Sequence, residues 1–166
     1  MVRSLLAALI VLGIPSLATA NTGRLATDPP DTAQCVTHAA QTFRVPELPL
    51  WALLDVEGGR VGAVSRNTNG SYDIGPMQIN STWLPTLGRS GISEQMVRDN
   101  LCMNIYVGTW IFAKELQRHG GDMPKAFATY HSPTPRFQYR YLGLIQSALE
   151  KRVGRMKQEA ALARGS

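Results

Sequence analysis

Trp51-Ala-Leu-Leu-Asp-Val-Glu57-Gly-Gly59 is an apolar run that ends in one glutamate and two glycines. Its apolar residues predict a buried helix, and the paired glycines predict that this helix ends directly after Glu57. Burial raises the pKa of a carboxyl group, and the negative end of the helix dipole acts in the same direction. The sequence therefore predicts a carboxylic acid that keeps its proton at neutral pH, as acid-catalysed cleavage of a glycosidic bond requires.

A second patterned segment follows after a short loop and reads Asn67-Thr-Asn-Gly-Ser-Tyr-Asp-Ile-Gly-Pro-Met-Gln-Ile-Asn-Ser-Thr-Trp83. Glycine, asparagine and serine are frequent from Gly62 to Gly75, which disfavours a long helix. Thr-Asn-Gly-Ser predicts a tight turn of the kind that joins the strands of a hairpin. This is the one stretch for which the sequence predicts β-structure.

The rest of the chain predicts helices, whose boundaries are marked by capping residues. The final helix has an apolar face between residues 137 and 153, and we expect the last dozen residues to fray. The predicted fold class is mainly α with a small β-hairpin region, in a single domain. The predicted helix caps and starts, in chain order, are Asp31, Ser81, Ser93, Asn100 and Asp122.

The two segments resemble the catalytic core of the lysozyme-like lytic transglycosylases, in particular the small members that accompany type III and type IV secretion, conjugation and pilus systems. The resemblance extends from about Cys35 to Tyr141 and is most specific over residues 67–83, which match the family pattern N-x-N-G-S-x-D-x-G-x-M-Q-I-N-S-x-W. It implies a lysozyme-like α+β fold. It also implies an enzyme that cleaves the β-1,4 bond between N-acetylmuramic acid and N-acetylglucosamine in peptidoglycan and leaves a 1,6-anhydro sugar.

The resemblance implies two catalytic residues. Glu57 is expected to protonate the glycosidic oxygen and then to accept the proton of the C6 hydroxyl of muramic acid. Tyr130 falls where the family has the tyrosine of its A-x-Y-N motif, whose hydroxyl is expected to hydrogen-bond the acid. The family asparagine is His131 in this chain, and Ser132-Pro-Thr-Pro135 replaces the glycines that usually follow. Gly58 and Pro76 also depart from the family pattern, so the shape of the sugar subsites is expected to differ.

The resemblance also implies a set of substrate-binding residues. Gly75 is expected to allow close approach of the backbone to a sugar, and Gln78 to donate to muramic acid. Met77 and Ile79 are expected in the core instead, and the indole of Trp83 is as consistent with packing as with sugar stacking. The substrate-binding candidates are Ser65, Gly75, Gln78, Asn80 and Trp83.

Asp73 is a secondary candidate because it lies in the patterned loop. A two-carboxylate hydrolase needs a second acid across the cleft, so a muramidase that uses Asp73 and water is one alternative. The other interpretation is structural, with the carboxylate accepting from backbone donors of the Asn-Gly-Ser turn. A third possibility is a glycan-binding scaffold without turnover, against which the retention of Glu57 and Tyr130 argues.

The chain divides by composition into four parts. Residues 1–20 read as a signal peptide, with Arg3, an apolar run and Ala18-Thr-Ala20 before the expected cleavage site; an uncleaved anchor is the alternative. Residues 21–30 read as a linker, residues 31–150 as the transglycosylase domain and residues 151–166 as a basic tail. Export through the inner membrane to the periplasm is the expected localisation.

Cys35 and Cys102 are the two cysteines of the chain. In an oxidising compartment such a pair most often forms one structural disulfide, and two free buried thiols are the alternative.

The formal net charge of +5 fits an anionic cell-wall polymer, although it would fit nucleic acid or a membrane surface equally well. No basic run is interleaved with aromatic residues, so we expect no nucleic-acid partner. The expected partners are peptidoglycan strands and components of a secretion, conjugation or pilus complex. His38, His119 and His131 have no ligand spacing, so the sequence predicts neither a metal nor another cofactor.

Overall fold

The computed structural model describes residues 23–165 except residues 26 and 29. The signal peptide predicted at residues 1–20 lies outside the described residues. In chain order the elements are α1 (Pro30–Phe43), α2 (Glu47–Glu57), β1 (Val64–Arg66), β2 (Tyr72–Ile74), β3 (Ile79–Asn80), the short 3-10 helix η1 (Ser81–Trp83), α3 (Leu84–Gly88), α4 (Glu94–Asp99), α5 (Leu101–Arg118), α6 (Met123–His131) and α7 (Pro135–Gly165).

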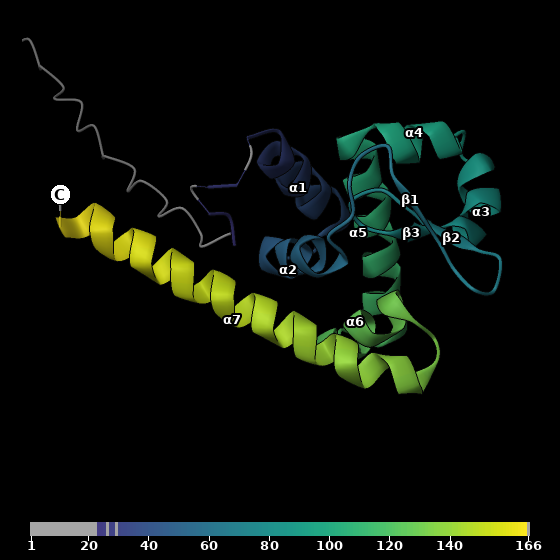
Figure 1. The fold of residues 1–166 in the computed structure, drawn as a ribbon. Coiled ribbons are helices and arrows are strands. Elements are labelled where there is room, and N and C mark those ends of the chain that lie inside the picture. Colours follow the sequence, from purple (N-terminus) through teal and green to yellow (C-terminus); the bar gives the residue numbers. More distant parts are fainter. Residues whose placement is uncertain (1–22, 26, 29, 166) are drawn as a thin grey trace, which may run out of the picture.

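Helix α5 lies at the centre of the molecule, and α1, α4, α6 and β3 pack against it (Figure 1). Helix α7 runs past α2 and α6 and contacts both of them. The core between these elements contains fully buried Leu50 and Leu53 of α2 and Ile105 and Phe112 of α5. The predicted fold class, mainly helical with a small region of β-structure, is confirmed.

The β-structure is an antiparallel sheet with strand order β1-β2-β3. The predicted turn joins β1 to β2, with the amide of Asn67 donating to the carbonyl of Ser71 at 2.8 Å and Gly70 at a φ of 85°. The sequence did not predict β3, which pairs with β2. Ser65 lies opposite Asp73, and Asp73 lies opposite Asn80. Directly opposed residues point to the same face of a sheet, so these three side chains share one face.

The predicted caps are confirmed at three helices. Ser93, Asn100 and Asp122 each accept a hydrogen bond from the backbone amide three residues later. At α1 the prediction was wrong by two positions, because a cap at Asp31 would start the helix at Thr32, whereas it begins at Pro30 and Asp31 lies inside its first turn. Proline fits that place because its fixed φ suits the first helical turn, where its missing amide proton costs nothing.

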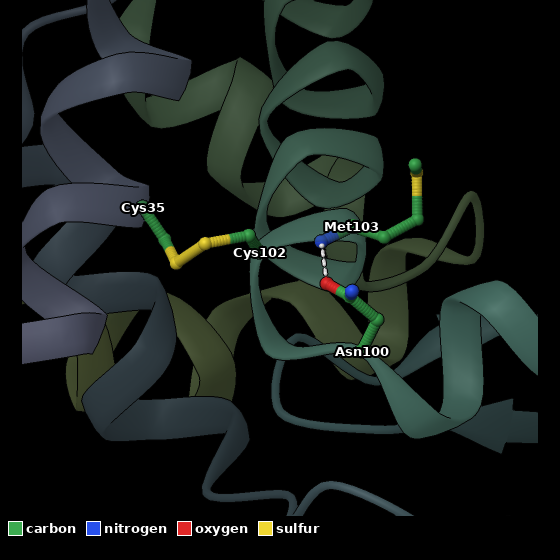
Figure 2. Close-up of a disulfide and its surroundings, with 4 residues drawn as sticks. All are labelled: Cys35, Asn100, Cys102 and Met103. Carbon is green, nitrogen blue, oxygen red and sulfur yellow. Dashed lines mark hydrogen bonds between the residues drawn. A yellow bond between two sulfur atoms is a disulfide. The ribbon is translucent and has the colours of Figure 1, made fainter.

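Cys35 of α1 and Cys102 of α5 form the predicted disulfide (Figure 2). Their Cα atoms are 4.9 Å apart and they are separated by 67 residues in the sequence. Cys102 follows Asn100, whose side chain accepts from the amide of Met103 at 2.8 Å and begins α5. The bond therefore fixes α1 to the first turn of the central helix.

Removing this bond should lower the stability of the fold. For Cys35→Ala/Cys102→Ala we expect the free energy of unfolding to fall by on the order of 4 kcal/mol, because the loop that the bond closes in the unfolded chain is long. Urea unfolding of the oxidised protein and of the double variant measures the difference. A loss of under about 1 kcal/mol would contradict the prediction that this bond restricts the unfolded chain.

The C-terminal region differs from the expectation. The last residues, which we expected to fray, belong to a helix: α7 is continuous from Pro135 to Gly165, across the boundary predicted at residue 150. Arg152 is buried, with 4% of its side chain exposed, and pairs with Asp28 at 2.9 Å. Leu25, which we assigned to a linker, is buried as well. Residues before and after the expected domain thus pack onto it. Arg152 of α7 joins them by pairing with Asp28 of the expected linker and with Asp55 of α2.

Among the described residues, no helix combines the length and the apolar character that crossing a membrane would require. The same part of the chain holds no group of three or more His, Cys, Asp or Glu side chains arranged to bind a metal ion.

Candidate active site

Glu57 is the last residue of α2, and two glycines hold it against the patterned segment. Gly58 takes the left-handed conformation with a φ of 58°, and its amide donates to the carbonyl of Leu54. The amide of Gly59 donates to the carbonyl of Pro76 at 3.3 Å. A side chain at Gly59 would collide with the carbonyl of Gly75 and with the side-chain amide of Gln78. Glycine at this position therefore lets the turn 75–78 close against the end of the helix.

A buried asparagine fixes that turn from the other side. Asn104 of α5 is fully buried; its side-chain oxygen accepts from the amide of Met77 at 2.8 Å, and its nitrogen donates to the carbonyls of Ile74 and Val97. Gly75 has a φ of 68°, and a side chain there would meet Asn104. The glycine is thus needed for packing on Asn104 and for its backbone conformation, a reason that we did not expect from the sequence.

The hydrogen-bond partner of the acid is Tyr141 of α7. Its hydroxyl donates to Oε1 of Glu57 at 2.5 Å, between residues 84 positions apart. The expectation that Tyr130 makes this bond was wrong, because the hydroxyl of Tyr130 donates to the carbonyl of Met77 at 2.9 Å. The acid's partner therefore comes from outside the motif, since α7 packs along α2 and brings Tyr141 to the carboxyl group.

Tyr130 nevertheless lies in the same electrostatic environment. Burial raises the pKa of its hydroxyl well above the usual range, and the negative charges of Glu57 and Asp73 act in the same direction. Tyr130 therefore fixes the backbone of Met77 from a position close to the acid. Met77 and Ile79 are both fully buried, which confirms their prediction as core residues.

The environment of Glu57 favours its protonated form. Burial is the main cause and raises the pKa of this carboxyl group to about 7; the hydrogen bond from Tyr141 lowers it, and the charge of Asp73 raises it. These effects are those that keep a catalytic acid protonated near neutral pH. The value of about 7 also allows the carboxylate to take the proton back, as a group with both acid and base roles must do.

The carboxylate of Asp73 is held by two asparagine side chains. Nδ2 of Asn80 donates to Oδ1 at 2.7 Å, and Nδ2 of Asn67 donates to Oδ2 at 3.0 Å. We had expected backbone donors from the turn, but the turn amide of Ser71 bonds to Asn69 instead, at 3.0 Å. Asp73 therefore connects β3 and the turn to β2 through side-chain hydrogen bonds. Its negative charge also raises the pKa of Glu57.

The remaining predicted site residues lie on β1, on η1 and in the turn between β2 and β3. Ser65 is exposed on β1, on the face that it shares with Asp73 and Asn80. Gln78 has a φ of 48° and uses one of its amide protons to bond the carbonyl of Gly75 at 2.8 Å. Trp83 on η1 packs edge-to-face on Trp110 of α5, with ring centroids 5.4 Å apart. The indole of Trp83 is thus at least partly a packing group.

Sequence reasoning missed Tyr141 and Asn104. We had placed Tyr141 only on the apolar face of the last helix. A buried tyrosine hydroxyl usually has a hydrogen-bond partner, so a tyrosine on that face could have indicated a polar contact in the core. Asn104 lies in the first turns of the helix that we predicted to begin at Asn100. A buried amide side chain must find partners, and its position there could have indicated a role in holding a loop.

Residues 34–138 match the family model described as the transglycosylase SLT domain. The chain belongs to this family. Glu57, Asp73 and Tyr130 lie within the matched range, whereas Tyr141 lies three residues beyond it. The assignment of Tyr141 to the SLT site therefore comes from the structure.

Curated relatives of this SLT chain include the Invasion protein IagB of Salmonella typhimurium, which is 33% identical over 103 residues, 61% of this chain and 64% of the relative. The Protein IpgF of Shigella flexneri is 30% identical over 103 residues, 61% of this chain and 67% of the relative. A Peptidoglycan-binding-like protein of Escherichia coli O157:H7 is 33% identical over 94 residues, 52% of this chain and 56% of the relative. The chain thus spans somewhat under two thirds of the first of these relatives.

The pKa of Glu57 predicts the pH dependence of any reaction in which it acts as an acid. The protonated form is the active one, so kcat/KM should be high below pH 7 and should fall about tenfold per pH unit above it. Rates on purified cell wall between pH 5 and pH 9 measure this limb. A midpoint near the ordinary value of a glutamate would contradict the effect of burial that we assign to this site.

Proposed function

We propose that this protein is a peptidoglycan lytic transglycosylase that cleaves the β-1,4 bond between N-acetylmuramic acid and N-acetylglucosamine. The observation that carries the proposal is the acid itself: a buried carboxyl group whose pKa is raised to about 7 and which accepts a hydrogen bond from Tyr141 at 2.5 Å. Membership of the SLT family supports the substrate class. The whole reaction needs one carboxylate, since the substrate supplies its own nucleophile.

In this proposal the two oxygens of Glu57 have different tasks. Oε1 accepts a hydrogen bond from the Tyr141 hydroxyl, so the carboxyl proton is expected on Oε2. Oε2 gives this proton to the glycosidic oxygen as the bond from C1 of muramic acid breaks. The C6 hydroxyl then forms a bond to C1 and returns its proton to the Glu57 carboxylate. The products are a 1,6-anhydro end and a free hydroxyl on the departing sugar.

In this proposal Asp73 acts through structure and charge. Both of its oxygens accept from asparagine amides, which leaves it less free to activate a water molecule. Its charge raises the pKa of Glu57 and so favours the protonated acid. The second candidate is a muramidase in which Asp73 activates water, and the proximity of the two carboxyl groups is the observation in its favour.

Product analysis separates the two reactions. Purified cell wall is digested with the protein, and the released muropeptides are analysed by mass spectrometry. We expect anhydro-muramic acid ends, whereas reducing ends carry one additional water and would show hydrolysis. Reducing ends from the wild type would overturn the proposal.

Asp73→Asn gives a second test in the same assay. If Asp73 acts through structure and charge, the variant should lose stability by roughly 0.5–3 kcal/mol, since hydrogen bonds to a charged group are lost. Its rate per folded molecule should fall far less than that of a variant at Glu57, and its products should remain anhydro ends. A loss as large as that of the Glu57 variant would favour the hydrolase.

The cellular role follows from the same proposal. Cell-wall cleavage by an exported enzyme in the periplasm would open the wall locally, and the relatives suggest where such an opening is needed. One of them carries the name Invasion protein and another the name Peptidoglycan-binding-like protein. We propose that this protein serves a secretion, conjugation or pilus apparatus. Loss of transfer or secretion in a deletion strain, restored by the wild type and not by a Glu57 variant, tests this role.

A further inference from the structure

The ring of His131 lies flat on the ring of Tyr141. Their centroids are 4.1 Å apart and their planes differ by 6°. His131 is the last residue of α6, whereas Tyr141 lies in the second turn of α7 and donates to Glu57. His131 is exposed to solvent as a residue. His131, which stands where the family has asparagine, therefore contacts Tyr141, and Tyr141 in turn contacts Glu57.

The connection between α6 and α7 is built to hold this stack. The carbonyl of Ser132 accepts from the side-chain amide of Gln138 at 2.8 Å, and the hydroxyl of Ser132 accepts from the amide of Thr134 at 3.1 Å. The amide of Ser132 donates to Ala128 at 3.1 Å. Pro133 and Pro135 fix two φ angles in the same four residues. A loop with this many constraints gives His131 a defined position relative to α7.

We propose that His131 is a positioning residue for the reaction, which holds the ring of Tyr141 in the plane from which its hydroxyl reaches Glu57. This inference rests on the proposed function, because it concerns the same acid. The hydroxyl of a tyrosine moves when the ring swings about the Cα–Cβ bond, and a second ring packed on one face hinders that swing, so the 2.5 Å hydrogen bond is kept through the reaction. His131 thus replaces, by an aromatic contact, the asparagine that its family has at this position.

The charges around the stack are compatible with this role. Asp73 of β2 faces His131 and Glu57, and Tyr130 of α6 and Tyr141 of α7 face Glu57. Burial lowers the pKa of His131, and Asp73 opposes that effect. The imidazole is therefore mostly neutral at neutral pH, and its contact with Tyr141 is between two uncharged rings.

A double-mutant cycle tests whether His131 acts through the Tyr141 hydroxyl. The variants are His131→Asn, Tyr141→Phe and the combination, with His131→Phe as the variant that keeps an aromatic ring. His38→Asn is a matched control, because it removes an exposed imidazole that stacks on Tyr106 elsewhere on the molecule. The first measurement is the pKa of Glu57 by carbon-13 NMR of the labelled carboxyl group, which needs no turnover.

The hydrogen bond from Tyr141 lowers the pKa of Glu57, so loosening it raises that pKa. We expect His131→Asn to raise it by up to about 1, in the same direction as Tyr141→Phe. We expect no further rise when His131→Asn is added to Tyr141→Phe, and a value close to wild type for His131→Phe and His38→Asn. An unchanged pKa in His131→Asn, or an equal change in both backgrounds, would overturn the inference.

The second measurement is the rate of anhydro-muropeptide release per folded molecule. His131→Asn should lose roughly 2- to 10-fold, and His131→Phe should recover most of that loss. In the Tyr141→Phe background the same change should cost little. If the wild type releases no anhydro ends, the proposed function fails, while the NMR cycle still decides the role of His131. A loss in His131→Asn of the same size in both backgrounds would instead place His131 on the substrate and overturn the inference.

Discussion

Glu57→Gln is expected to reduce the rate of glycan cleavage by at least about 100-fold, since general acid–base catalysis typically contributes ~10²–10⁴-fold. The substitution removes the proton that Oε2 would give to the glycosidic oxygen, while it preserves the size of the side chain. The amide oxygen can still accept from Tyr141, as Oε1 does at 2.5 Å. The fold should therefore survive, and thermal unfolding should show little change. Muropeptide release per folded molecule measures the loss.

Glu150→Gln is the matched control for this variant. Glu150 lies exposed on α7, where it accepts from Gln146 at 2.9 Å. The same chemical change there should leave the rate within about twofold of wild type, since it touches only a solvated surface. A Glu57→Gln protein that keeps more than about a hundredth of the wild-type rate would show that Glu57 is not the acid.

Arg152→Met is expected to lower the free energy of unfolding by roughly 3–5 kcal/mol, because it leaves the nearly buried carboxylate of Asp28, and the more exposed one of Asp55, without their partner. The guanidinium of Arg152 binds Asp55 of α2 at 2.5 Å and Asp28 at 2.9 Å, and it lies 4.6 Å from the ring of Trp51. The side chain of Asp28 is 9% exposed and cannot recover full hydration. Methionine fills a similar volume, so the loss reports on charge more than on packing. Urea unfolding measures it.

Arg155→Met is the control on the same helix, since Arg155 is exposed one turn later. Its effect should stay within about 0.5 kcal/mol of wild type. Adding Asp28→Asn and Asp55→Asn to Arg152→Met should recover part of the loss, because the uncompensated charges are then gone. If Arg152→Met and Arg155→Met were equally mild, the buried cluster would not hold α7 on the domain.

Arg152 also matters to the site through geometry. Tyr141 reaches Glu57 only because α7 lies along α2, and the Asp55–Arg152 pair joins these two helices three turns from the tyrosine. We therefore expect Arg152→Met to weaken activity even at temperatures where the protein remains folded. The stability of this protein and the position of Tyr141 beside Glu57 thus depend on the same helix.

The sequence predicted the local elements well, because their signals are local. Asn100 and Asp122 begin helices by accepting hydrogen bonds from the backbone amides three positions later. Gly58 ends α2 because a left-handed residue there costs glycine little. The third strand and the continuous α7 were missed because they depend on contacts with residues distant in the sequence. Residues 79–80 become a strand only by pairing with β2, and residues 151–165 remain helical with Arg152 packed on distant carboxylates.

The catalytic candidate could also be predicted, since Glu57 carries its own evidence in an apolar run that ends in two glycines. What the sequence by itself determined was thus the chemistry available: one acid at a helix end, a hairpin beside it and a disulfide across the domain. The tertiary structure alone decided the partners. Tyr141 instead of Tyr130 bonds the acid, two asparagines hold Asp73, and Asn104 fixes the turn at Met77. Each of these contacts joins residues of different elements, so it depends on how helices and strands pack and leaves no periodic signal in the chain.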